Sequence, residues 1–322
     1  MGQHLIIGGG GMVGQKLAYA LAASPIAPDD TVTLFDLGFP EEGAPAAKRV
    51  IGNATDAALI KSLVATRPDT IFHLAAIVSG QAETDFDLGW QVNMAAFQTF
   101  LEAVRSEHVA SGGTYRPRVI FTSSIAVFGP PFPEKIDDAF LCAPQTSYGA
   151  QKAISELLLN DYIRKGFCDG MSIRLPTICV RPGKPNLAAS SFFSGIIREP
   201  LNGQEAILPV DTDVRHWHAS PRSAAGFLHH AATLDTSHLG NRRAMNLPGV
   251  SCTVEEQIEA LREIAGNDVV ALIKPVPDDA IRTIVSGWPR NFDPKRAIDL
   301  GFKAEPNFHE IIRVYIDEDL KA

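Results

Sequence analysis

Three side chains near the middle of the chain are suited to moving a proton. Tyr148 and Lys152 are four positions apart in a strongly helical stretch, so they lie on one helix face. A free phenol titrates near ~10, so acting as a base near pH 7 requires its pKa to fall by about 3 units, which corresponds to roughly 4 kcal/mol. One ammonium about 4 Å away supplies about that much at an effective dielectric near 20. Ser124 can hydrogen-bond the reacting oxygen as a hydride leaves the carbon. These residue types predict the oxidation of an alcohol.

The same spacing also fits an ordinary surface pair of tyrosine and lysine. The catalytic interpretation is favoured because Tyr148 and Lys152 come one helix after a β-branched, apolar run that ends in Ser124. That run is predicted to be a strand whose carboxyl end carries hydroxyl groups, and ligands of open α/β sheets bind at such ends.

The N-terminus carries a glycine-rich loop. An apolar run meets Gly8, Gly11 and Gly14, spaced G-x-x-G-x-x-G, and then opens into a helical stretch. Gly8 permits a tight turn, Gly11 lets the backbone approach a pyrophosphate, and Gly14 lets helix and strand pack closely. We expect the phosphates on the helix start, at Met12 and Val13. This pattern predicts a dinucleotide-binding fold.

An acidic residue follows these glycines at the spacing expected for a dinucleotide site. The run 31–36 is predicted to be a second strand that ends in Asp36, where a ribose 2′-hydroxyl would lie. NAD is therefore favoured over NADP, since a 2′-phosphate would meet a like charge. The alternative is that Asp36 only caps a turn.

Further cofactor contacts are predicted along the next strands. Asp56, at the end of the predicted third strand 49–56, can accept from the adenine amino group, and the small Ala75 and Ala76 would let the cofactor lie close over the end of the fourth. Asn93 lies early enough in the following helix to brace the site. His73, inside the fourth strand, is predicted to be a core residue.

Strand and helix patterns alternate as far as Pro176 and less regularly beyond it, which predicts an α/β fold: a Rossmann-type doubly wound parallel sheet with a smaller C-terminal α/β substrate domain. The predicted NAD-binding domain is 1–176 plus 211–236, and the smaller substrate-binding domain is 177–210 plus 237–322. Later elements are predicted at 190–198, 214–218, 221–228, 254–265, 269–273 and 308–316, where the segments 214–218 and 269–273 are strands and the others helices.

Composition excludes several classes of protein. The 322 residues are 45% hydrophobic and 20% charged, with no apolar run long enough to cross a bilayer. A formal charge of −8 argues against nucleic-acid or anionic-membrane partners. The four scattered cysteines suit reduced thiols, and no signal peptide is recognisable, so we expect a cytoplasmic protein with a small-molecule substrate.

Taken together, these motifs resemble the extended short-chain dehydrogenase/reductase superfamily, the NAD-dependent epimerases and dehydratases, over essentially the whole chain. The matching residues are Gly8, Gly11, Gly14, Asp36, Asp56, His73 to Ala76, Asn93, Phe121 to Ser124, Tyr148, Lys152 and the run 214–218. The resemblance implies that Tyr148 is the acid/base, that Lys152 tunes it and holds the nicotinamide ribose, and that Ser124 orients the substrate.

The chain departs from the nucleotide-sugar epimerases of this superfamily. It has Val127-Phe128-Gly129 where they usually have V-Y-G, and the segment 176–183 replaces their N-x-Y-G-P-type run. The stretches 174–186 and 213–224 are instead most similar to members that act on a four-carbon sugar acid. This similarity implies NAD-dependent oxidation of such an acid at C2 to the 2-oxo acid.

A small carboxylate substrate needs a cationic anchor, and Arg181, Lys184 and Arg215 are the candidates. In the epimerases an arginine matching Arg215 grips a diphosphate, so its role stays open. The expected substrate contacts are Ser79, Ser124, Thr177, Arg181, Asn186 and Arg215. His216 and His218 share one face of a predicted strand, but no third ligand is in view, so no metal is expected.

Two other functions remain open: a nucleotide-sugar epimerase or dehydratase that keeps NAD bound, and a catalytically silent NAD-binding regulator. The intact set of Ser124, Tyr148 and Lys152 argues against the regulator. A homodimer through helices near 95–108 and 146–165 is also expected, because the superfamily resemblance implies it and because the second helix carries an apolar excess at Leu157, Leu158, Leu159 and Tyr162.

Overall fold

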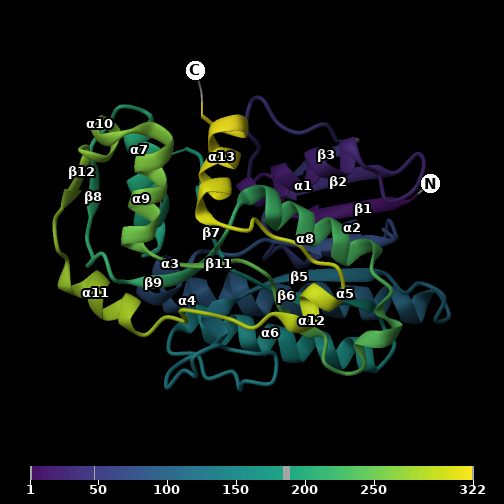
Figure 1. The fold of residues 1–322 in the computed structure, drawn as a ribbon. Coiled ribbons are helices and arrows are strands. Elements are labelled where there is room, and N and C mark those ends of the chain that lie inside the picture. Colours follow the sequence, from purple (N-terminus) through teal and green to yellow (C-terminus); the bar gives the residue numbers. More distant parts are fainter. Residues whose placement is uncertain (1, 47, 184–188, 321–322) are drawn as a thin grey trace.

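A parallel sheet covered on both faces by helices forms the larger part of the molecule (Figure 1). The computed structural model describes residues 2–46, 48–183 and 189–320. Within them the sheet has seven strands in the order β10-β6-β5-β4-β1-β2-β3, all parallel. The strands are β1 (Gln3–Ile7), β2 (Thr31–Asp36), β3 (Lys48–Ile51), β4 (Thr70–His73), β5 (Arg118–Ser124), β6 (Asp169–Leu175) and β10 (Ala244–Asn246). The predicted doubly wound α/β fold is confirmed.

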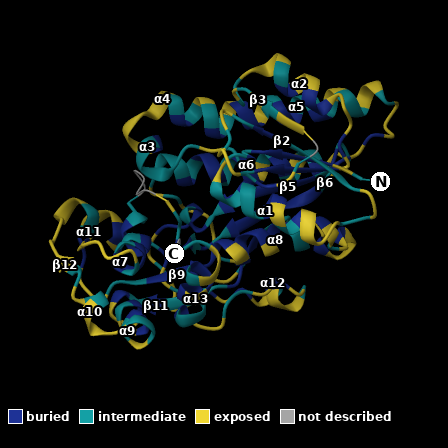
Figure 2. Cartoon of the chain, turned by 90° about the horizontal axis from the view of Figure 1, so that it is seen from above, coloured by how far each residue is buried: buried dark blue, intermediate teal, exposed yellow. Residues whose placement is uncertain are grey.

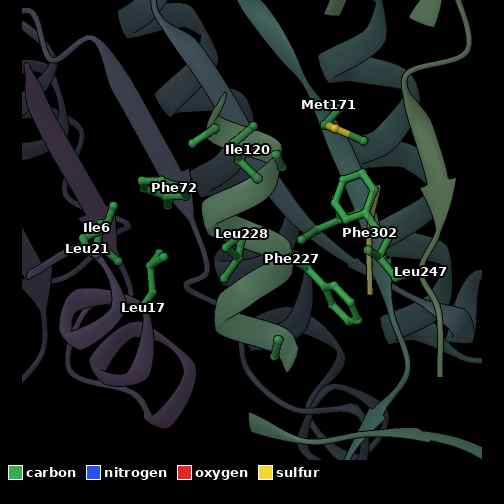
Figure 3. Close-up of a cluster of buried hydrophobic side chains, with 14 of the residues drawn as sticks. Ile6, Leu17, Leu21, Phe72, Ile120, Met171, Phe227, Leu228, Leu247 and Phe302 are labelled. Atoms are coloured by element: carbon green, nitrogen blue, oxygen red, sulfur yellow. The ribbon is translucent and has the colours of Figure 1, made fainter. Parts of the chain in front are cut away.

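Each face of the sheet has its own apolar core, because successive side chains of a strand point to opposite faces. Ile6 of β1 packs with α1 (Met12–Ala23) and α8 (Pro221–Thr233), as Figure 3 shows. Its neighbours Leu5 and Ile7 pack on the other side, with α2 (Ala57–Val64), α5 (Ala96–Ala110) and α6 (Ser147–Arg164). Seen from above, buried strands lie between these two helical layers (Figure 2).

The chain reverses its direction across the sheet next to β1. From β1 it continues to β2 and β3 on one side, and β4 then pairs with the opposite edge of β1. Open α/β sheets bind ligands at such a switch point, outside the carboxyl ends of the strands. The glycine-rich loop after β1 therefore occupies the place where a dinucleotide is held.

Shorter helices connect these strands and cover their ends. They are α3 (Ser79–Thr84), α4 (Phe86–Gly89), the π-helical turn η1 (Trp90–Ala95), η2 (Ile125–Val127), η3 (Thr236–Leu239) and α12 (Lys295–Asp299). The start of α8 follows its sequence signal: Pro221 is the first helical residue, and the Ser220 side chain accepts from the Ser223 amide at 2.9 Å.

A second region packs beside the carboxyl edge of the large sheet (Figures 1 and 2). It has two small sheets in the described residues, β11-β9-β7 and β12-β8. Its elements are β7 (Thr177–Ile178), α7 (Ser191–Leu201), β8 (Ala206–Leu208), β9 (Arg215–Ala219), β11 (Val250–Thr253), α9 (Val254–Ala265), α10 (Asn267–Val270), β12 (Ile273–Pro275), α11 (Asp279–Ser286) and α13 (Phe308–Glu318). Apolar side chains of α7, α9 and α13 form its core.

Three expectations about the elements were wrong in detail. The predicted strand 269–273 is mostly helix α10 and a turn, and the strand is β12, which starts at Ile273. β3 ends at Ile51, so Asp56 does not end a strand. The segment 244–246, assigned from sequence to the smaller domain, is β10 and pairs with β6 in the large sheet. Short apolar runs of this kind do not distinguish helix from strand, or one sheet from another.

In the described ranges no helix is both long enough and apolar enough to span a bilayer.

Candidate active site

Two of the motif glycines are required by the packing of the chain itself. Gly8 has φ +92°, and its amide donates to the Phe35 carbonyl at 2.8 Å. A Cβ on Gly8 would lie 2.6 Å from the Ala75 amide nitrogen, and one on Gly14 would lie 2.4 Å from the Gly8 carbonyl oxygen. Both distances are shorter than contact allows, so these glycines let β1, β4 and α1 approach one another.

Gly11 is different, because the protein itself leaves room there. A Cβ on Gly11 would meet only the Gly8 carbonyl oxygen, at an ordinary 3.6 Å, and the residue is exposed. Gly11 precedes α1, which has neither a side-chain cap nor an acidic residue in its first turn. The first-turn amides at Met12 and Val13 have no intrahelical acceptor, and the helix dipole favours an anion there. These residues fit the pyrophosphate of a dinucleotide.

Asp36 holds the glycine-rich loop against the end of β2. Its carboxylate accepts from the Gly10 amide at 2.9 Å and from the Leu37 amide at 2.7 Å. Each carboxylate oxygen keeps a further lone pair for a ribose hydroxyl. Asp36 therefore caps a turn and is also placed where the sequence predicted a ribose contact.

Asp56 is the N-cap of α2. One carboxylate oxygen accepts from the amides of Ala58 and Leu59 at 3.0 and 3.1 Å. Asp56 is exposed, and its second oxygen is the atom available for the predicted contact with an adenine amino group.

Asn93 has a buried side chain that links two segments next to the predicted site. Its Oδ1 accepts from the Ile77 amide at 2.9 Å, and its Nδ2 donates to Gln151 Oε1 at 2.8 Å. Asn93 thus fixes the segment after β4, which contains Ala75 and Ala76, against α6. His73 lies in the core as predicted, among Phe rings, and burial lowers its pKa to about 3.

Tyr148 and Ser124 come together at the start of α6. Thr146 caps this helix by accepting from the Gly149 amide at 3.1 Å. Burial raises the pKa of Tyr148 to about 12, although the Arg181 charge and a hydrogen bond with Ser124 act in the opposite direction. Ser124 also accepts from the Ala126 amide at 3.1 Å.

The expected lowering of the Tyr148 pKa by Lys152 was wrong, for two physical reasons. The Lys152 ammonium lies 5.6 Å from the centre of the Tyr148 ring and donates to the Thr122 carbonyl at 2.8 Å. Burial also lowers the pKa of Lys152 itself to about 7, against the charge of Glu156, so its positive charge is only partial near neutral pH. The pair shares a helix face, as its spacing predicted.

A buried ion pair that sequence reasoning missed supports these residues. Arg174 of β6 donates to both oxygens of Glu156, from Nε at 2.9 Å and from Nη2 at 2.7 Å. Glu156 also accepts from Ser123 Oγ at 2.5 Å. Because Glu156 follows Lys152 by one helical turn, the spacing Tyr148, Lys152, Glu156 was the available signal. The pair ties α6 to the tips of β5 and β6.

The predicted substrate residues lie in different settings. Arg181 is largely buried, and its guanidinium donates to the Ile178 carbonyl at 2.9 Å and to Ser190 Oγ at 3.0 Å. Among the described residues no acidic side chain acts on its pKa, which burial lowers. Arg215 is instead paired with Glu256 at 3.2 Å and is 38% exposed.

Two of the other candidates lie near the carboxyl ends of β6 and β4. Thr177 begins β7 and shares a hydrogen bond with His216, and Ser79 begins α3, just after the segment that Asn93 holds. Lys184 and Asn186 lie outside the described residues.

Arg215 lines a separate hollow of about 600 Å³, together with Pro130, Phe132, Glu134 and Arg290. Its wall does not include Ser124, Tyr148 or Lys152. The structure thus separates two of the proposed anchors, with Arg181 near the tyrosine and Arg215 in this neighbouring hollow.

Comparison with known proteins agrees with this geometry. The chain is 45% identical to a D-erythronate dehydrogenase of Cupriavidus necator, over 98% of each chain, and 42% identical to one of Haemophilus influenzae, over 98% of this chain and 99% of the relative. A solved structure titled a nucleoside-diphosphate-sugar epimerase, from Agrobacterium tumefaciens, is 51% identical, with a TM-score of 0.93 over 99% of this chain and 94% of that one.

Residues 4–235 match the NAD dependent epimerase/dehydratase family. This segment contains the glycine-rich loop, Asp36 and the set of Ser124, Tyr148 and Lys152. The family's cofactor is NAD, and the loop fits the pyrophosphate of such a dinucleotide. The chain belongs to the NAD dependent epimerase/dehydratase family and is an NAD-dependent oxidoreductase.

Proposed function

We propose that this protein is an NAD-dependent dehydrogenase that oxidises the C2 hydroxyl of D-erythronate to 2-dehydro-D-erythronate. The two curated relatives that match nearly the whole chain carry the name D-erythronate dehydrogenase. The observation that carries the proposal within this chain is Arg181, a largely buried cation that acts on the Tyr148 phenol and has no acidic partner in the described residues. A small substrate with a carboxylate next to the reacting carbon supplies that partner.

In the proposed reaction Tyr148 takes the proton of the C2 hydroxyl, and Ser124 donates a hydrogen bond to the same oxygen. Arg181 has five N–H donors and uses two in the contacts described, so donors remain for the substrate carboxylate. When bound, NAD⁺ supplies the hydride acceptor and a positively charged ring, which favours the tyrosinate. Gly11, Met12, Val13 and Asp36 are the residues proposed to hold it.

Lys152 is proposed to hold the nicotinamide ribose while its ammonium stays anchored on the Thr122 carbonyl. Burial lowers the pKa of Lys152 to about 7, and the neighbouring Glu156 carboxylate acts in the opposite direction and favours its charged form.

A second candidate function rests on the hollow lined by Arg215 and Arg290. About 600 Å³ with two arginines on its wall suits a nucleoside diphosphate, and the A. tumefaciens relative is titled as an epimerase of such sugars. Against it, Arg215 is already paired with Glu256.

A substrate screen separates the two. Four- to six-carbon aldonates and UDP-sugars are each incubated with the enzyme and NAD⁺, while NADH formation and sugar composition are followed. The dehydrogenase predicts NADH with D-erythronate and no change in any UDP-sugar. Conversion of a UDP-sugar without net formation of NADH would instead show that the protein is an epimerase.

We also propose a cytoplasmic homodimer built on α5 and α6. All four cysteines are free, which suits a reducing compartment. The apolar excess on α6 is smaller than its sequence indicated: Leu159 is fully buried within the subunit, and Leu157, 72% exposed, is the residue that supports an interface. Sedimentation at micromolar concentration should give a dimer, and Leu157→Glu should shift it to monomer; a wild-type monomer contradicts the proposal.

The division into an NAD domain (1–176 plus 211–236) and a substrate domain (177–210 plus 237–322) is kept as a proposal, with 244–246 moved to the NAD domain because β10 pairs with β6.

A further inference from the structure

A hydrogen-bonded chain lies behind one wall of the proposed substrate site. Ser124 of β5 is paired with Leu175 of β6, and Thr177 comes only two residues later, at the start of β7. Thr177 Oγ1 is 2.6 Å from His216 Nε2, and His216 Nδ1 is 3.0 Å from the Pro289 carbonyl oxygen. Thr177 is half-buried, whereas His216 is buried, and Thr177 is the member of the chain closest in sequence to the strand partner of Ser124.

The direction of these hydrogen bonds follows from their last member. A backbone carbonyl only accepts, so the proton of a neutral His216 is on Nδ1 and is donated to Pro289. His216 Nε2 must then accept, and the Thr177 hydroxyl must donate to it. With its proton used in this way, Thr177 Oγ1 can only accept from any further partner.

The protein holds His216 in this state. The ring is 2% exposed, stacks on Phe193 at 5.2 Å with an interplanar angle of 1°, and meets Trp288 at 5.2 Å on a tilted contact. Burial lowers the pKa of His216 to about 4, so the ring is neutral at physiological pH. The His216 ring is therefore not free to rotate and carries no extra proton, so the direction of these hydrogen bonds is fixed.

We infer that His216 is a positioning residue for substrate selection: through Thr177 it presents a hydrogen-bond acceptor that selects 2-hydroxy acids carrying a further hydroxyl group beyond C2. This inference rests on the proposed dehydrogenase function and extends it. A hydroxyl of the substrate chain donates to Thr177 Oγ1, whereas a 2-hydroxy acid with a plain alkyl chain leaves that acceptor without a partner in a half-buried site. Leaving a buried polar group unpaired is disfavoured, which is how such a site rejects the deoxy analogue.

The test compares two ligands with the same number of carbons. D-Erythronate is the substrate, and (R)-2-hydroxybutanoate, which lacks both further hydroxyls, is added as a competing ligand in the NADH assay. In Thr177→Val and His216→Phe we expect the KM for D-erythronate to rise about tenfold. The inhibition constant of (R)-2-hydroxybutanoate should stay within about twofold of wild type, because this ligand makes no bond to Thr177.

Conservative variants separate positioning from general damage. Thr177→Ser keeps the hydroxyl and should keep the wild-type KM, and His216→Gln keeps an acceptor and should recover part of the loss. The double variant Thr177→Val/His216→Phe should lose no more than either single variant, since both break one chain. His238→Phe, at a side chain 80% exposed, is the matched control for a histidine-to-phenylalanine change.

The outcomes are distinguishable. An equal rise of the KM for D-erythronate and of the inhibition constant for (R)-2-hydroxybutanoate means that the variants distort the site. An unchanged KM for D-erythronate means that Thr177 does not contact the substrate. Either result overturns the inference and leaves the proposed function standing. Failure of the wild-type enzyme to form NADH from D-erythronate defeats the proposed function, and the inference with it.

Discussion

The cofactor loop and the substrate wall of this site are built in different ways. The loop, residues 8–14, acts mainly through its backbone: the amides of Met12 and Val13 at the start of α1 have no intrahelical acceptor, and Gly8 and Gly14 stand where a Cβ would strike a neighbouring backbone atom. The wall combines three segments that are distant in sequence: Thr177 and Arg181 come from one, His216 from β9, and the Pro289 backbone carbonyl from the third.

This difference determines what each part can discriminate. Backbone amides at a helix start bind any phosphate, so the loop provides a common cofactor site. The wall presents one largely buried cation, Arg181, and one acceptor, Thr177 Oγ1, whose direction is set by the buried, neutral ring of His216. We therefore expect changes in the loop to alter NAD affinity and changes in the wall to alter the choice of substrate.

The largest expected effect comes from Tyr148→Phe. This change removes the group that is proposed to accept the substrate proton, and it leaves both the cofactor loop and the substrate wall intact. Turnover should fall by about 10²–10⁴-fold, the usual contribution of a general base, while NAD⁺ affinity stays nearly unchanged. Steady-state NADH formation measures the turnover, and a titration with NAD⁺ measures the affinity for the cofactor. Turnover above roughly a tenth of wild type would mean that another group accepts the proton.

Arg181→Met should show that the wall selects the carboxylate. Removing one partner of a buried charge pair costs about 2 kcal/mol or more, so kcat/KM for D-erythronate should fall by at least roughly 30-fold with NAD⁺ affinity unchanged. Arg215→Met is the matched control and should stay within a few-fold of wild type. If the larger loss follows Arg215 instead, the carboxylate binds in the neighbouring hollow.

Asp36→Asn changes the loop side alone. The amide oxygen still accepts from the Gly10 amide, while the charge opposite the ribose is lost. NAD⁺ binding should weaken by about 1.5 kcal/mol, roughly tenfold, and the preference over NADP⁺ should narrow, with KM for D-erythronate unaffected. Equal use of both coenzymes by the wild type would reduce Asp36 to a turn cap.

The last prediction concerns stability in acid and leaves ligand binding aside. Burial lowers the pKa of His73 to about 3, of His216 to about 4 and of His218 well below its usual value. The unfolded chain takes up protons on these rings below about pH 6.5 and the folded chain does not, so their stabilisation is complete above that pH and is lost as the pH falls. Urea unfolding should show this slope, with a lower free energy of unfolding at pH 5 than at pH 7.

His216→Phe should reduce that slope, while the exposed control His238→Phe should leave it unchanged. A free energy of unfolding that does not change between pH 7 and pH 5 would mean that these rings are not held neutral in the folded protein.

The predictable part of the molecule coincides with the part made from local sequence. The loop, Asp36 at the end of β2, and the start of α8 at Pro221 all follow from neighbouring residues whose backbone preferences are strong. The shared helix face of Tyr148 and Lys152 follows from spacing alone.

The rest depends on contacts between distant segments, which no local pattern encodes. The predicted lowering of the Tyr148 pKa was wrong because burial raises it and because Lys152 donates to the Thr122 carbonyl of β5. The Glu156–Arg174 pair, which joins α6 to β6, was missed for the same kind of reason. Likewise β10 reaches the large sheet only because the chain returns to it after β9. Burial and tertiary hydrogen bonds set these properties, so they appear only in the folded structure.

Oxidation of D-erythronate carrying deuterium at C2 tests the central claim most directly. The dehydrogenase account predicts that the deuterium is transferred to NAD⁺, giving deuterated NADH and 2-dehydro-D-erythronate in equal amounts. NADH free of deuterium would show that a different carbon is oxidised, and the absence of NADH together with conversion of a UDP-sugar would contradict the account altogether.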